Sequence, residues 1–85
     1  MYKKITLNNL KIGKSAKVLK ITNIGSIKRR ILDIGLTEGT IVIAELASPF
    51  NDPIAYRIRN ALIAIRKDDS KNIIVEELEW LRRLL

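Results

Sequence analysis

The sequence predicts a small, mainly β fold: a half-open barrel of about five strands, with one helix inserted after the first long strand. Short strand-like segments recur along the chain and are separated by turn residues, which is typical of small antiparallel barrels. One helix signature, GSIKRRILDIGLTEG at 25–39, interrupts them. The 85 residues suffice for a single domain, and 47% of them are hydrophobic, which is enough for a small core.

Five segments carry the strand pattern. In SAKVLKI, Ala16 and Val18 share one face, whereas Ile21 belongs to the other, because side chains alternate along a strand. In IAYRIR, Tyr56 lies on one apolar face with two isoleucines. Asn60 suits a tight turn, because asparagine tolerates a positive φ. The expected strands span residues 15–21, 40–47, 54–59, 61–66 and 72–76, with a turn or a single helical turn at Asn8–Asn9 and a turn at 67–71.

The inserted helix has recognisable ends. Ser26 is a suitable N-cap, since its hydroxyl can accept a hydrogen bond from a free backbone N–H. Gly35 suits the left-handed position just past the helix, and Leu36 can then fold back on the last turn. The residues spaced along one helical face are Ile27, Ile31 and Ile34.

The C-terminal residues predict a short amphipathic helix. Acidic residues from Glu76 onward precede Arg82 and Arg83, the order that a helix dipole favours. We therefore divide the chain into a barrel, residues 1–76, and a helix, residues 77–85. Its apolar stripe of leucines is expected to pack on the barrel or, alternatively, on a second copy or another partner.

The residue types exclude most chemistry. The chain has no cysteine and no histidine, so the commonest general base and the thiolate and imidazole ligands of transition metals are absent. We expect no enzyme, no cofactor and no metal site, although scattered carboxylates exist at Asp33, Glu38, Glu45, Asp52, Asp68 and Asp69. No apolar run approaches the roughly 20 residues of a membrane span, and the N-terminus lacks the apolar core of a secretion signal.

The net charge of +7 allows two interpretations. An anionic partner would explain it, but so would an ordinary lysine-rich surface. A small basic nucleic-acid-binding barrel is one alternative function. The lysines are scattered along the chain and few aromatic residues are available to stack on bases, so we do not expect nucleic acid as the partner.

The motif spacing resembles the FeoA family. The matching segments are RRILDIGLTEG at 29–39, the PFNDP loop at 49–53, the YRIR strand at 56–59 and a closing Ile73–Val75, together with Leu10, Gly13 and Val18. The resemblance covers about residues 7–76. It implies an SH3-like barrel, a domain that also forms the C-terminal module of iron-dependent repressors. The absence of a winged helix in this sequence favours the transport accessory over a detached regulatory domain acting on such a repressor.

The resemblance further implies a non-enzymatic cytoplasmic accessory protein of bacterial ferrous-iron transport. It would bind the cytosolic GTP-binding domain of a FeoB-type transporter, to aid assembly or to regulate it, and be recruited to the inner face of the membrane without inserting. Homo-oligomers are also conceivable. The candidate contact residues are Arg30, Leu32, Leu36, Pro49, Phe50, Asp52, Pro53, Arg57 and Arg59.

Four of these residues allow two interpretations. Phe50 would anchor a partner if exposed, but we expect it to plug the mouth of the barrel. Arg30 would either hold the helix to the barrel or meet the partner. Arg57 and Arg59 are expected to share a strand face, where they could contact an acidic surface or could simply point into solvent.

Overall fold

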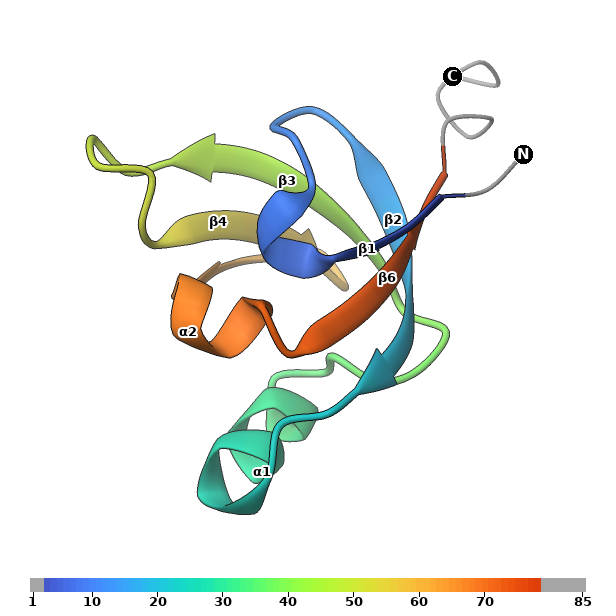
Figure 1. Ribbon diagram of the computed structural model, residues 1–85. Coiled ribbons are helices and arrows are strands. Elements are labelled where there is room, and N and C mark those ends of the chain that lie inside the picture. The colour runs from blue at the N-terminus through green and yellow to red at the C-terminus, as the bar shows by residue number, and fades with distance from the viewer. Residues whose placement is uncertain (1–2, 79–85) are drawn as a thin grey trace.

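The computed structural model describes residues 3–78 of the chain (Figure 1). It contains six strands and three short helical segments. Their bounds are β1 Lys3–Thr6, η1 Leu7–Asn9, β2 Ser15–Ile21, α1 Gly25–Asp33, β3 Ile41–Ala47, β4 Ile54–Ile58, β5 Ala61–Ile65, α2 Lys67–Ser70 and β6 Ile73–Glu77. Within the described residues, no helix is long and apolar enough to cross a membrane.

All six strands belong to one antiparallel sheet, in the order β1-β6-β2-β3-β4-β5. The sheet curves around a single core, and β2 is long enough to pair with β3 near its start and with β6 along most of its length (Figure 1). The edge strands β1 and β5 do not pair with each other, so the barrel stays open. The mainly β fold class is confirmed, with six strands where about five were predicted.

One strand departs from simple alternation. Ile21 is buried on the same side as Val18, although the pattern placed the two on opposite faces. The pairing of β2 with β6 shifts register between Val18 and Lys20. Such a β-bulge adds one residue to one strand, so every later side chain changes face.

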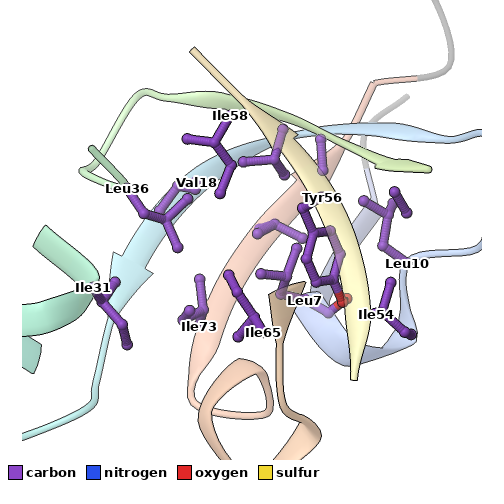
Figure 2. Packing of buried hydrophobic residues seen from close by; sticks show 14 of the residues in the cluster. Leu7, Leu10, Val18, Ile31, Leu36, Ile54, Tyr56, Ile58, Ile65 and Ile73 are labelled. Carbon is purple, nitrogen blue, oxygen red and sulfur yellow. The ribbon is translucent and has the colours of Figure 1, made fainter. Parts of the chain in front are cut away.

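The core lies between the sheet's inner face and the helical segments (Figure 2). Tyr56 at its centre is fully buried, and its hydroxyl donates to the carbonyl oxygen of Leu7 at 3.2 Å. Ile54 and Ile58 flank it on β4, as the alternation of that strand predicted. Other fully buried side chains come from η1, β2, β3 and β6: Leu7, Val18, Val42, Ile73 and Val75.

The C-terminal end of α1 forms as predicted. Gly35 has a φ of +95°, and its N–H donates to the carbonyl of Leu32 at 3.0 Å. The N–H of Leu36 donates to the carbonyl of Ile31 at 3.2 Å. This pair of bonds is a Schellman motif, which satisfies carbonyls that would otherwise lack partners at the helix end. Leu36 thereby returns into the core.

The start of α1 differs from the prediction. The helix begins at Gly25, with Ile24 at the cap position, and no side chain caps it. Ser26 therefore lies inside the first turn, two residues past the N-cap position, so its hydroxyl does not act as the N-cap. The predicted helical face is also only partly buried, since Ile31 and Ile34 contact the core but Ile27 is 40% exposed.

The predictions from the sequence missed or misassigned three segments. Strand β1 was not predicted, because KKIT has no clear alternation and is extended by its pairing with β6. Residues 67–70 form a helical turn, α2, where a plain turn was expected. Glu76 and Glu77 belong to β6, so the predicted helix does not begin at either residue. Residues 79–85 of that prediction lie outside the described part of the chain.

Candidate partner-binding surface

The β3–β4 loop, residues 48–53, is held by its own hydrogen bonds. The N–H of Asn51 donates to the carbonyl of Ser48 at 2.8 Å, and the N–H of Asp52 donates to the Ser48 hydroxyl at 2.9 Å. Asn51 has a φ of +62°, a conformation that asparagine tolerates better than most residues. The bond between Asp52 and Pro53 is cis. The loop therefore has a defined shape.

Phe50 projects from this loop into solvent. It is 89% exposed, the highest value among the large apolar side chains within residues 3–78. The expectation that Phe50 plugs the barrel is therefore wrong, because the tight turn directs its ring away from the core. Pro49 beside it is also exposed. A rigid loop presenting an exposed aromatic ring is suited to entering an apolar pocket on another protein.

Leu46 adds a further apolar side chain just before the loop, and is 58% exposed. The pairing of β3 with β4 shifts register between Ala44 and Leu46. Val42 and Ala44 are buried, so strict alternation would bury Leu46 as well, and the bulge turns it outward instead. Leu46 was not among the predicted contact residues, because nothing in the residue pattern indicates the bulge.

Asp52 and Pro53 serve the fold more than the surface. Both are half-buried. The carboxylate Oδ1 of Asp52 accepts a hydrogen bond from the N–H of Lys67 at 3.0 Å. Lys67 is the first residue of α2, whose initial N–H groups have no partner inside the helix. Asp52 therefore caps α2 from a distant loop and ties that loop to the domain.

The candidates on and after α1 lie away from this loop. In Figure 1, α1 and the β3–β4 loop are at different ends of the molecule. Leu32 is 40% exposed, whereas Leu36 is fully buried and cannot itself touch a partner. Arg30 forms an ion pair with Asp69 at 3.4 Å, and its side chain is 69% exposed. Arg30 thus both links α1 to α2 and reaches solvent.

Arg57 and Arg59 do not share a strand face. Arg57 on β4 holds Glu45 through two hydrogen bonds, one of which, from Nη2 to Oε1, spans 3.2 Å. These bonds, together with the positive charge of the Arg57 guanidinium, lower the pKa of Glu45. Arg59 follows the end of β4, has a φ of +48°, and bonds back to the carbonyl of Gly35 at 2.9 Å. Because Arg59 lies in the tight turn after β4, its side chain points toward the end of α1 and not along the face that Arg57 occupies.

The predicted contact residues thus occupy separate places. Phe50 and Pro49 form an apolar tip with Leu46 nearby in sequence, while Arg30 and Leu32 are exposed on different sides of α1. Leu36 is buried, and Asp52 and Pro53 are half-buried parts of the fold. Arg59 is exposed but bonds to the end of α1, and Arg57 pairs with Glu45. Among residues 3–78 no three acidic side chains come close enough to form a metal site. The arrangement offers contact surfaces for a macromolecule.

This fold, an open curved antiparallel sheet with a helix after its first long strand, defines a small SH3-like domain. The FeoA domain family matches residues 5–77, so the chain belongs to the FeoA family. A FeoA from Stenotrophomonas maltophilia, described as a prokaryotic SH3 domain protein, shares the fold at a TM-score of 0.74 and 24% identity, covering 84% of this chain and 88% of that one. The predicted family and SH3-like fold are both confirmed.

Two further proteins are similar over most of this chain. The FeoA-like protein of Clostridium acetobutylicum has a TM-score of 0.82 and 38% identity, over 92% of this chain and 91% of that one. An iron transport protein of Porphyromonas gingivalis, a fusion of Fe(2+) transport protein A with the Fe(2+) transporter FeoB, is 30% identical over 70 residues. That match spans 82% of this chain but 8% of the fusion protein.

Proposed function

We propose that this protein is a non-enzymatic accessory of bacterial ferrous-iron transport that binds the cytosolic GTP-binding domain of a FeoB-type transporter. The fusion protein of P. gingivalis carries the proposal, because there a domain similar to this chain is covalently joined to such a transporter. A fusion keeps two domains at high effective concentration, which is useful when the two act together. The protein would act in the cytoplasm, next to the membrane that holds the transporter.

The tip of the β3–β4 loop would make the central contact. Phe50 is 89% exposed, and burying a phenylalanine side chain contributes about 1.5–3 kcal/mol. The loop is already ordered by Ser48, Asn51 and Asp52, so little conformational entropy is lost on binding. Basic side chains would steer the approach, which affects the association rate more than the lifetime of the complex.

The function is tested by titrating the full chain into the purified cytosolic GTP-binding domain of a FeoB-type transporter, without nucleotide and with GDP or a non-hydrolysable GTP analogue. We expect saturable binding in at least one nucleotide state, and a changed rate of GTP hydrolysis when GTP is supplied. Absence of binding in all three states would contradict the proposal.

The contact residue is tested with Phe50→Ala. Truncating a central aromatic anchor should weaken binding by about tenfold or more. Ile24→Ala is the matched control, because Ile24 is another apolar side chain with 83% exposure, located at the start of α1. Equal weakening by both variants, or none by Phe50→Ala, would show that the loop is not the centre of the interface.

A further inference from the structure

The two edges of the sheet differ in how they are protected. Strand β1, at one edge, carries two lysines in its sequence KKIT. Strand β5, at the other edge, reads ALIAI, with no charge and no proline. It pairs with β4 in unbroken register from Ile58↔Ala61 to Ile54↔Ile65, so no bulge twists it away. Natural proteins often protect exposed edges with charges, prolines or bulges, and β5 has none of these three.

The outer side of β5 has backbone groups available for another strand. Ile58 and Ala61 flank the two-residue turn at Arg59–Asn60, so they form a hydrogen-bonded pair, and the pairs then alternate along the ladder. Leu62 and Ala64 consequently direct their N–H and C=O groups away from β4. Within residues 3–78, neither residue makes a hydrogen bond outside the sheet ladder.

A groove of about 330 Å³ separates this edge from α1. Apolar side chains line it on both sides: Ile31 of α1 and Ile34 just after it, and Ile63, Ala64 and Ile65 of β5. In an antiparallel ladder, alternate residues of an added strand would direct their side chains toward this apolar lining. The groove therefore favours an extended segment with apolar residues at every second position.

The charges around the groove favour an acidic occupant. Arg30 and Arg66 line it together with one acid, Asp69. Arg66 makes no ion pair within the described residues. Arg30 pairs with Asp69 at 3.4 Å, but its side chain is 69% exposed, so that pair is weak and can be exchanged. A second copy of this chain would bring like charges together, because each carries +7.

We propose that β5 accepts an acidic, extended segment of another protein as a seventh strand. Its apolar residues would lie in the groove, and its carboxylates would meet the solvent-exposed side chains of Arg30 and Arg66 at the rim of the groove. This is strand addition, in which main-chain hydrogen bonds provide affinity and alternate side chains provide specificity. The site is separate from the tip at Phe50, and it stands whether or not the transporter supplies the segment.

The test uses the full chain and a fluorescent nine-residue peptide that alternates valine and glutamate. We expect saturable binding that weakens as salt is added, because exposed ion pairs are screened. The same peptide with lysine in place of glutamate should bind at least about tenfold more weakly. Backbone N-methylation at the positions that face β5 should also weaken binding about tenfold or more, through lost hydrogen bonds.

Protein variants locate the site. Arg66→Glu should weaken binding of the glutamate peptide, whereas Arg29→Glu, the same charge change on α1 outside the groove, should leave it within about twofold of wild type. Amide chemical shifts of the wild-type protein should change most at Leu62 and Ala64. No saturable binding, an N-methylated peptide that binds equally well, or equal weakening by both variants would overturn the proposal.

Discussion

Arg59 donates a hydrogen bond from its Nε to the carbonyl oxygen of Gly35 at 2.9 Å. The two residues are 24 positions apart, and the bond joins the β4–β5 turn to the end of α1. The guanidinium also lies 3.4 Å from the hydroxyls of Thr37 and Thr40. A cation at this point is favourable because the carbonyl groups of a helix end carry partial negative charge. Arg59 thus links the end of the helix to the sheet, in addition to the packing of Ile31 and Leu36 in the core.

Gly35→Ala should therefore cost more stability than Gly39→Ala. Both glycines have a left-handed φ, +95° and +89°, where a side chain costs about 1–2 kcal/mol. A Cβ at Gly35 would also lie 2.9 Å from Cδ of Arg59, whereas one at Gly39 would meet nothing within 4 Å. Chemical denaturation of both variants measures the difference.

The Arg59→Ala background isolates that contact. In it, the difference between the two glycine variants should shrink, because the added methyl group no longer displaces a hydrogen-bonded side chain. An undiminished difference would mean that the backbone at Gly35, and not Arg59, is what excludes a larger residue.

Tyr56 should make stability depend on alkaline pH. Burial of its hydroxyl raises the pKa of Tyr56 from 10.0 to about 12. The unfolded chain then loses this proton at lower pH than the folded chain does. The resulting contribution to the free energy of unfolding is on the order of 2 kcal/mol. It is fully present below pH 10 and is lost as the pH rises from about 10 to 12.

Tyr56→Phe is the control for that dependence. At pH 8 it should be destabilised by only about 1 kcal/mol, the value of one hydrogen bond, since the Leu7 carbonyl keeps its bond from the N–H of Leu10. Between pH 10 and 12 the stability gap to wild type should close and then reverse, because only the wild type loses the stabilisation linked to its phenol proton. If the two denaturation profiles stay parallel over that range, Tyr56 is not the responsible group.

Asp52→Ala should destabilise the domain by about 0.5–2 kcal/mol, because α2 loses the acceptor for the N–H of Lys67. Asp52→Asn retains an acceptor oxygen and should recover most of that stability. Amide hydrogen exchange at Lys67 should accelerate in the alanine variant and not in the asparagine variant. Equal losses in both variants would instead assign the effect to the charge of Asp52.

The pair formed by Glu45 and Arg57 is best tested by titration. Hydrogen bonding to Arg57 lowers the pKa of Glu45, so its carboxyl carbon should titrate in NMR spectra below the ordinary glutamate range. Arg57→Gln should move that titration back toward the ordinary value. The pair is partly exposed, so the shift in the pKa of Glu45 should be smaller at high salt. A titration that does not respond to the substitution would remove Arg57 as the cause.

Most of the local structure could be predicted because it depends on near neighbours in the sequence. The alternation in IAYRIR correctly placed Ile54, Tyr56 and Ile58 in the core. The succession of Gly35 and Leu36 correctly predicted the Schellman ending of α1. The same approach missed β1 and both bulges, since these depend on which strand lies alongside and not on the segment's own residues.

The contact surface was harder to predict. The PFNDP loop was selected correctly as a distinct feature, but the exposure of Phe50 was not. Arg57 and Arg59 look equivalent in the sequence, yet one pairs with a neighbouring strand and the other supports a helix end. The groove beside β5 was not anticipated, because its two walls are far apart in the chain.

By itself, the sequence of this protein determined the FeoA family, the mainly β fold class and the position of α1, because these follow from periodicity, turn residues and motif spacing. Only the tertiary structure decided that Phe50 is exposed, that Leu36 is buried, and that Ile31 and Ile65 face the same groove. The physical reason is the range of the interactions. Backbone preferences act over a few residues. Burial and charge pairing depend instead on segments that meet only once the sheet has curved around its core.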